Sequence, residues 1–306
     1  MNSKNNSFFF ENIPDMESTI KFINHIKSLK LIDWDIFDFE KLINSYFPVI
    51  PFPTVDFIPR GTILFRARLN DKPEPFFHEH EIFAPPETNI TKFGRANYPM
   101  ESVFYCSENA NISIQEVIQE LKNNIFLENK KVFITIGEWY VMENLRMCNI
   151  VHSKKVAAQR YDLLMRMFDH HGLLIKAIKG KEFDSRKFNS HNLICEFFAN
   201  EFSKQTVKCH HDYKISAYYS KQLSELNNSL PENKFDGLNY ASTKNKYLGD
   251  NQSIFIGSAK SKLKLINANF IICSDFDFHN NTFNKKNVAK AESLKNGKLN
   301  WIPYLN

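Results

Sequence analysis

Apolar residues recur at helical spacing along most of the first 50 positions. One broad apolar face is formed by Ile20, Phe22, Ile23, Ile26 and Leu29. A second run with the same period extends from Asp35 to Tyr46, so two helices are predicted. The segment Pro48–Pro53, with three prolines, then interrupts the pattern and marks a boundary. We therefore expect a helical extension over residues 1–50 and a second domain over residues 51–306.

Beyond this boundary, short segments alternate between apolar and polar residues, as strands do. Strands are predicted at 62–68, 103–106, 132–141, 145–151, 237–240, 253–256 and 263–273. Helices are predicted at 112–126, 155–178, 189–205 and 213–228. Short strands at both ends with helices between them are typical of an α+β fold rather than of a regular parallel sheet. A long loop rich in Pro and Glu covers residues 70–100, and loops of this length are usually functional or disordered.

Composition narrows the class of protein. Hydrophobic residues make up 43% and charged residues 24% of the 306 positions, which is ordinary globular usage and argues against wholesale disorder. The formal charge of +5 suits a site for an anionic small molecule. It forms no tight Lys/Arg stripe, so nucleic-acid binding is not expected.

Targeting signals and cysteine usage indicate the compartment. No apolar run approaches the roughly 20 residues that a membrane span requires, so no membrane association is expected. The N-terminus has neither an extended apolar core nor a cleavage site, so no signal peptide is predicted. The five cysteines are an odd number without paired spacing, which argues against a disulfide framework and fits a reducing cytosol. We expect a cytoplasmic protein.

Glu116 has two interpretations. Ser113-Ile-Gln-Glu116 is a capping-box pattern, in which the glutamate reaches back to the first main-chain N–H of its helix. Taken alone, this interpretation is the better one. However, Tyr105 ends a strand that enters the same turn, and a helix N-terminus directly after a strand is a favoured place for anionic ligands. Glu116 is therefore also a candidate for chemistry.

Three arginines precede this helix. Arg66 and Arg68 share one face of a predicted strand, and Arg95 lies in the loop Gly94-Arg-Ala-Asn97. Each one alone could be an ordinary surface arginine. A guanidinium matches phosphate geometry bidentately, so two or three converging arginines would hold a pyrophosphate.

Other sites are excluded by spacing. Ser242 lacks a Gly-x-Ser-x-Gly elbow, so it is interpreted as a hydroxyl that holds a ribose rather than as a hydrolase nucleophile. Neither a P-loop nor a Gly-x-Gly-x-x-Gly turn is present. Thiols and imidazoles occur at His78, His80, His191, Cys195, Cys209, His210 and His211. They lack Cys-x-x-Cys or His-Glu-x-x-His spacing, so no metal site is expected.

The order of these motifs resembles the RES-domain family, which is named for its Arg, Glu and Ser. The first motifs are Leu64-Phe-Arg-Ala-Arg68, Ala84-Pro-Pro86, Gly94-Arg-Ala-Asn97, Phe104-Tyr-Cys-Ser107 and Glu116. The later ones are Val132–Trp139, Leu145–Ile150, Tyr219–Leu223, Phe235–Ser242 and Asn251–Phe255. The resemblance covers about residues 60–257, with an apparent helical insertion near 155–210.

The resemblance implies an α+β core like that of the ADP-ribosyltransferase toxins, with two small, mainly antiparallel sheets that clasp NAD⁺. It implies cleavage of NAD⁺ at the nicotinamide–ribose bond, by phosphorolysis or by hydrolysis. NAD⁺ is then the substrate and inorganic phosphate a co-substrate, with no prosthetic group. Many members are toxins held in check by a helix-turn-helix antitoxin. This chain is longer than the compact toxin members.

Site residues follow from the same resemblance. Its implied catalytic residues are Glu116, Arg66, Tyr105 and Ser242, and Arg95 and Asn251 are further NAD⁺-binding candidates. Glu116 would stabilise positive charge on the ribose, Tyr105 would stack on nicotinamide, and Arg66 would hold phosphate. Two alternatives stay open, namely a protein ADP-ribosyltransferase and an NAD-binding module without turnover. Neither the oligomeric state nor the role of residues 1–50 follows from the sequence.

Overall fold

The computed structural model describes most of the chain in two compact units. It covers residues 12–48, 50–51, 54–121, 131–150, 153–158, 160, 162, 164–166, 185–229, 234–243, 247, 249–277, 282–293 and 296–304. The helical unit comprises Met1–Val55, Thr91–Pro99 and Cys148–Lys234. The sheet unit comprises Asp56–Ile90, Met100–Met147 and Phe235–Asn306. Residues 1–50 and the predicted helical insertion thus fall in the same unit.

Helices form most of the described part of the helical unit. They are α2 (Met16–Ser28), η1 (Leu31–Asp33), α3 (Ile36–Tyr46), α6 (Lys154–Ala157), α8 (Ser185–Phe202), η3 (His210–Tyr213) and α9 (Lys214–Ser229). Asp15 and Asp35 cap α2 and α3, because each carboxylate accepts a bond from the main-chain N–H three residues later. The two N-terminal helices predicted from the apolar period are confirmed. Of the predicted helix 155–178, residues 167–178 lie outside the described part of the chain.

Aromatic side chains fill the core of the helical unit. Phe47 packs on Phe22, Phe197 and Phe198, and Phe198 contacts Tyr219 with ring centroids 4.9 Å apart. All five side chains are at least nine-tenths buried. These aromatic side chains therefore supply apolar area that holds the helices together.

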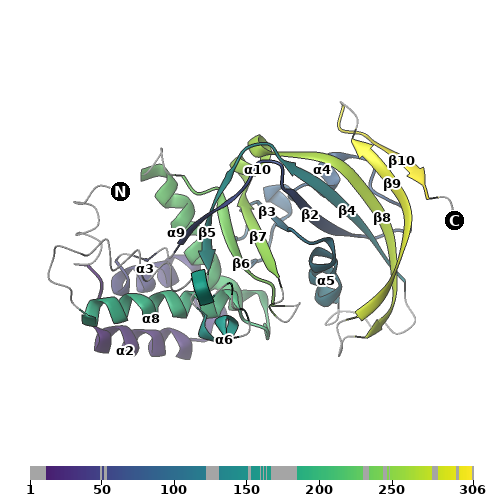
Figure 1. Ribbon diagram of the computed structural model, residues 1–306. Helices are drawn as coiled ribbons and strands as arrows, with labels where there is room; N and C mark the ends of the chain where they lie inside the picture. Colours follow the sequence, from purple (N-terminus) through teal and green to yellow (C-terminus); the bar gives the residue numbers. More distant parts are fainter. Residues whose placement is uncertain are drawn as a thin grey trace. The chain divides into compact units, whose positions relative to one another are not determined.

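The sheet unit contains a single ten-stranded sheet of order β1-β5-β6-β7-β3-β2-β4-β8-β9-β10 (Figure 1). The first two residues of β1 and the last three of β5 are grouped with the helical unit. The strands are β1 (Thr54–Ile58), β2 (Ile63–Asn70), β3 (Val103–Ser107), β4 (Val132–Val141), β5 (Leu145–Ile150), β6 (Gly237–Ala241), β7 (Asp250–Phe255), β8 (Leu263–Asp277), β9 (Thr282–Ser293) and β10 (Leu299–Pro303). The helices of this unit are α4 (Glu79–Ile82), η2 (Glu87–Asn89), α5 (Ala110–Leu121) and α10 (Ile256–Lys262). The α+β class is confirmed.

The pairing between β2 and β3, in the middle of the sheet, is short. Strand β2 pairs with β4 over eight residues, from Ile63 to Asn70, whereas β2 pairs with β3 at Phe65↔Ser107 alone. In sheet order, the strands β1-β5-β6-β7-β3 form one half and the strands β2-β4-β8-β9-β10 form the other. A single ladder pair joins the two halves. The resemblance implied two small sheets. In the structure the two halves are joined through this pair into one sheet.

The two faces of the sheet carry separate cores. On one face, Ile114 and Ile118 of α5 pack against Ile134, Ile136 and neighbouring apolar side chains. This is the α5 face, and the helix lies mainly on β2 (Figure 1). On the other face, a larger cluster that includes Trp139, Leu64 and Phe104 packs under α4 and α10. Because side chains alternate along a strand, each residue of β2, β3 and β7 can be assigned to one of these faces.

Seven predicted strands are confirmed, and three strands were missed. The missed ones are β1, β9 and β10, and the helix α10 was also not predicted. Within the predicted loop 70–100, short helical turns form at α4 and η2. Strand β8 extends to Asp277, four residues beyond the prediction, because β9 pairs along it.

Candidate functional site

Glu116 lies in the second turn of α5. The helix begins at Ala110, three residues before the serine of the predicted capping box. The Ser113 hydroxyl donates instead to the main-chain oxygen of Phe65 at 2.7 Å, which ties α5 to β2. The capping-box interpretation of Glu116 is therefore wrong, because Ser113 is not at the N-cap and the carboxylate has other donors.

Those donors come from the β6–β7 hairpin. Ser242, directly after β6, donates from Oγ to Glu116 Oε1 at 2.7 Å. Asn251 in β7 donates from Nδ2 to the same oxygen, also at 2.7 Å. Ser242 is fully buried and Asn251 is 8% exposed, while Glu116 is half-buried. Within the described part of the chain, Oε2 of Glu116 accepts no hydrogen bond, so this oxygen is available to a ligand.

A glycine allows the hairpin to approach α5 this closely. A Cβ atom on Gly249 would lie 2.1 Å from Cδ1 of Ile112, which is buried in the first turn of α5. The Ser242 N–H donates to the Gly249 oxygen at 2.7 Å, so the turn that carries Ser242 is fixed by the same residue. Ser107 adds a second tie, because its hydroxyl donates to the main-chain oxygen of Asp250.

Tyr105 stands on the same face as Asn251. In the β3–β7 ladder Tyr105 pairs with Ser253 and Ser107 pairs with Asn251, so Tyr105 and Asn251 are diagonal neighbours. Such neighbours are about 7–8 Å apart. Tyr105 is half-buried, so an aromatic ring lies near the carboxylate with part of its surface open to a ligand.

Arg66 reaches Tyr105 from the opposite face of β2. Its Nη1 donates to the main-chain oxygen of Tyr105 at 2.8 Å, and its guanidinium lies 5.3 Å from the centre of the Phe104 ring. Arg66 is 9% exposed. It therefore crosses the seam between β2 and β3 beside the single Phe65–Ser107 pair, and it fixes the strand that carries Tyr105.

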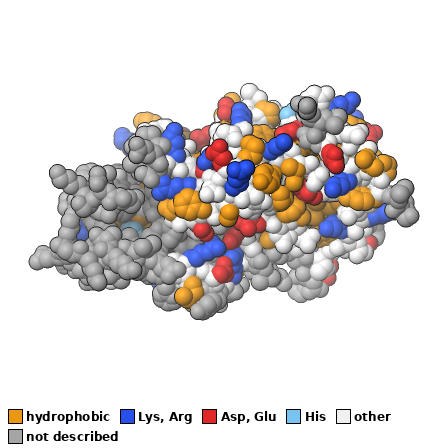
Figure 2. Space-filling model, turned by 45° about the horizontal axis from the view of Figure 1, so that its top comes forward, with side chains coloured by type: hydrophobic (Ala, Val, Ile, Leu, Met, Phe, Trp, Pro, Cys, Tyr) orange, Lys and Arg blue, Asp and Glu red, His pale blue; other side chains and the backbone are white. Residues whose placement is uncertain are grey.

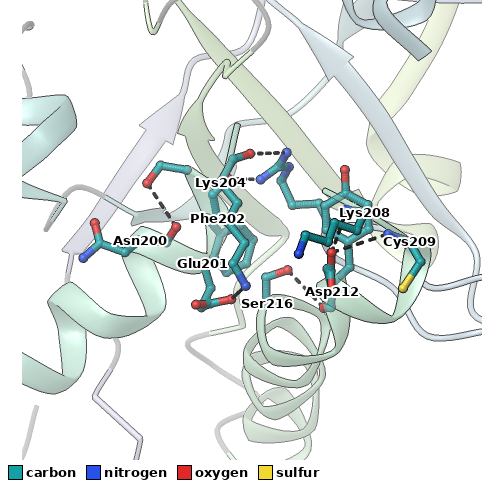
Figure 3. A network of polar contacts seen from close by, with 11 residues as sticks. Asn200, Glu201, Phe202, Lys204, Lys208, Cys209, Asp212 and Ser216 are labelled. Carbon is teal, nitrogen blue, oxygen red and sulfur yellow. Dashed lines mark hydrogen bonds and ion pairs between the residues drawn. The ribbon is translucent and has the colours of Figure 1, made fainter. Parts of the chain in front are cut away.

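The other two arginines have separate contacts. Arg68 donates to the main-chain oxygen of Glu81 and lies 5.5 Å from the Phe76 ring centre, so it anchors α4. Arg95 belongs to the helical unit. It donates to the main-chain oxygens of Phe202 and Lys204. The Lys204 side chain forms an ion pair with Glu201 (Figure 3). Arg95 is thus placed by contacts at the C-terminal end of α8.

Asp236 is a buried carboxylate that the sequence did not single out. Its Oδ2 accepts from the Arg146 N–H at 2.8 Å and from Lys262 Nζ at 2.9 Å, and its Oδ1 accepts from Ser258 at 2.6 Å. These bonds join β5, β6 and α10. The position of Asp236 in the motif Phe235–Ser242 was the available signal, and its contacts are structural rather than directed at the Glu116 cluster.

Surface chemistry gives little further guidance. On the face shown in Figure 2, basic and acidic side chains are intermixed over the described residues and form no basic stripe. Among the described residues, no three His, Cys, Asp or Glu side chains are grouped to hold a metal ion. In the same ranges, no helix combines the length and apolarity needed to cross a membrane. The five cysteines, all within the described ranges, have free thiols.

The Glu116 cluster thus brings together a carboxylate, a hydroxyl, an amide and a neighbouring aromatic ring from three separate parts of the sequence. A carboxylate fixed through one oxygen can stabilise positive charge or accept sugar hydroxyls through the other. Of the residues predicted for the site, Glu116, Ser242 and Asn251 are in direct contact, and Arg66 contacts the main chain of Tyr105. Comparison with models of known protein families finds no match for this chain, and comparison with curated proteins finds none either.

Proposed function

We propose that this protein consumes NAD⁺ by cleaving the bond between nicotinamide and ribose, with Glu116 as the central catalytic group. The observation that carries the proposal is the convergence of Ser242 and Asn251 on Oε1 of Glu116. The motif order predicts both residues for the site, although they are more than 120 positions from Glu116 in the sequence. Residues so far from Glu116 in the sequence would not be expected to share one of its oxygens by chance.

The chemistry requires a negative group beside the reacting carbon. When the C1–N bond of the nicotinamide ribose breaks, its electron pair leaves with nicotinamide and the sugar becomes oxocarbenium-like. The Oε2 atom of Glu116 would stabilise this charge. A phosphate oxygen then forms the new bond at C1, which gives ADP-ribose-1″-phosphate. With water as the acceptor, the products are ADP-ribose and a released proton.

Tyr105 and Arg66 support this role in different ways. The Tyr105 ring, which is half-buried, would stack on the cationic nicotinamide ring. Arg66 already donates to the Tyr105 main chain and is largely buried, so we assign it to positioning β3 rather than to direct phosphate binding. Arg95, which belongs to the helical unit, is left out of the proposed site.

The arrangement of the sheet also supports an ADP-ribosyltransferase-like core. Such a core needs two antiparallel sheets that diverge around the nucleotide. Here Phe65↔Ser107 is the one ladder pair between the two halves of the sheet, and the Glu116 cluster lies beside that pair. An intracellular toxin or defence effector with an antitoxin partner is the role that best fits this activity.

Product analysis tests the proposal. Purified protein is incubated with NAD⁺, with and without phosphate, and the products are separated by chromatography. We expect nicotinamide and ADP-ribose-1″-phosphate in phosphate buffer, and no nicotinamide from Glu116→Gln. The matched control is Glu292→Gln, an exposed carboxylate on β9 with the same change of charge.

Each other outcome has a defined meaning. Free ADP-ribose in both buffers identifies hydrolysis. Labelled ADP-ribose on a macromolecule identifies a protein ADP-ribosyltransferase. Tight NAD⁺ binding without product over hours identifies a binding module. If Glu116→Gln stays folded and consumes NAD⁺ as fast as the wild type, the catalytic assignment is wrong.

A further inference from the structure

One row of paired residues runs across the seam of the sheet. In order from β6 to β10 it comprises Tyr240, Asn251, Ser107, Phe65, Glu138, Asn267, Glu292 and Asn300. Directly paired residues share a face, so all eight side chains lie on the α5 face. Phe65↔Ser107 is the one ladder pair between β2 and β3, so this is the one row of paired residues that runs from Asn251 into the far half of the sheet.

Asn251 on this row holds the Glu116 carboxylate of α5, and Glu138 is the next carboxylate along the row. It lies three strands from Asn251, which corresponds to about 14 Å along the sheet at roughly 4.8 Å per strand. Two asparagines of β8 hold it from one side. Asn267 donates to Oε2 at 3.0 Å and Asn269 donates to Oε1 at 2.7 Å. Tyr304 in turn donates to the Asn269 side-chain oxygen at 2.8 Å, which orients that amide.

The two asparagines fix the Glu138 carboxylate but leave some of its hydrogen-bond acceptor positions unused. Each carboxylate oxygen has about two acceptor positions, and the asparagines occupy one on each. Glu138 is half-buried, so its remaining acceptor positions are not sealed from solvent. Two parallel acceptors on a fixed carboxylate match the two hydroxyls of a ribose. The same pairing, an acidic side chain with a ribose 2′-hydroxyl, is a general device of dinucleotide sites.

We propose that Glu138 binds the adenosine ribose of NAD⁺ while Glu116 acts on the nicotinamide ribose. This inference rests on the proposed function. A dinucleotide has two riboses joined by a pyrophosphate, and Asn251, which donates to Glu116, lies about 14 Å from Glu138 on the same face of the sheet. Phe65 and Ser107 lie between them, so no third carboxylate opposes the pyrophosphate along this row.

A carboxylate beside the adenosine ribose should make the protein select between NAD⁺ and NADP⁺. A carboxylate at the adenosine ribose accepts the free 2′-hydroxyl of NAD⁺ and repels the 2′-phosphate of NADP⁺. The protein should therefore prefer NAD⁺ to NADP⁺, and removal of the Glu138 charge should reduce that preference. A merely structural role for Glu138 would change affinity for both dinucleotides equally.

Isothermal titration calorimetry tests the proposal. It measures the Kd of wild type, Glu138→Gln and Glu292→Gln for ADP-ribose and for 2′-phospho-ADP-ribose. Glu292 is two strands farther along the same row and exposed, so it controls for the change of charge. We expect Glu138→Gln to raise the Kd for ADP-ribose at least tenfold. The ratio of the Kd for 2′-phospho-ADP-ribose to the Kd for ADP-ribose should become smaller. Glu292→Gln should behave as wild type.

The two proposals fail in different ways. If wild type binds ADP-ribose but Glu138→Gln and Glu292→Gln both match it, Glu138 does not contact the ribose and the proposed function stands. If wild type binds neither ligand and releases no nicotinamide from NAD⁺, the proposed function fails and this assignment fails with it. A loss of affinity for both ligands in equal proportion would also overturn the ribose contact.

Discussion

The Ser242 hydroxyl and the Glu116 carboxylate, 126 residues apart in the sequence, form a 2.7 Å hydrogen bond between the end of β6 and α5. Asn251 donates to the same carboxylate oxygen from β7. The two donors sit on either side of one hairpin, and the Gly249 turn between them lies against α5. The geometry of this carboxylate is thus set by the hairpin and not by its own helix.

Removing either donor should slow catalysis without unfolding the protein. A hydrogen bond to a charged group contributes about 1.5–3 kcal/mol, so Ser242→Ala and Asn251→Ala should each lower kcat/KM by about tenfold to a hundredfold. Because both bonds end on Oε1, the double variant should lose less than the product of the single losses. Nicotinamide release measures the rates, and circular dichroism shows whether each variant is folded. Independent effects of the two substitutions would contradict a shared role.

Local patterns predicted the elements of this site better than their contacts. The alternation of Val132–Val141 and the helical period after Ile112 were sufficient to predict β4 and α5. The start of α5 was misjudged, because Ser113 matched a capping pattern while its hydroxyl bonds to β2. That bond depends on which strand lies beneath the helix, and no local pattern encodes it.

The missed strands have a related cause. Strand β9, Thr282–Ser293, is rich in Lys and Asn, which have low strand propensity. It forms because β8 and β10 pair with it on both sides. The burial of Arg66 was likewise hidden, because its acceptor on β3 is 39 residues away in the sequence. Contacts of this kind are set by tertiary structure, which can override local preference.

Asp236 should contribute to stability rather than to catalysis. Asp236→Ala leaves the Arg146 N–H, Lys262 and Ser258 without their shared acceptor. We expect a loss of about 3 kcal/mol in the free energy of unfolding, since breaking a buried ion pair leaves a charge uncompensated. Urea denaturation measures the loss, and Glu87→Ala, at an exposed carboxylate of η2, is the control. Equal midpoints for the two variants would show that the Asp236 network is not stabilising.

The cysteines should differ sharply in reactivity. Burial raises the pKa of Cys148 and of Cys273 to about 12, and it also raises the pKa of Cys106 and Cys195, so these thiols stay protonated at pH 8. Cys209 is half-buried. Because the thiolate is the reactive form, a disulfide reagent at pH 8 should modify one thiol quickly and the other four after unfolding.

Cys209→Ser should abolish the fast reaction and leave the slow one unchanged. A second fast-reacting thiol in the native protein would contradict the burial of the other thiols.

The raised thiol pKa values also determine the direction in which stability changes with pH. The unfolded chain loses thiol protons near pH 9 while the folded chain keeps them, so stability should fall as the pH rises above 9.

Two glycines of the sheet unit should respond oppositely to alanine. A Cβ atom on Gly237 would lie 2.1 Å from the main-chain oxygen of Ser253, inside the β6–β7 ladder. The backbone must move to relieve this contact, so Gly237→Ala should destabilise the protein by about 1–3 kcal/mol or more. Gly257 lies in α10 with no atom within 4 Å of its Cβ position. Gly257→Ala should therefore stabilise by about 0.5–1 kcal/mol through helix propensity. Thermal unfolding of the two variants measures both effects, and equal shifts in Tm would show that the β6–β7 contact does not constrain residue 237.

The same two variants should also differ in activity, because β6 leads to Ser242, which donates to Glu116. Displaced pairing at Gly237 should lower NAD⁺ turnover, while Gly257→Ala should leave it unchanged.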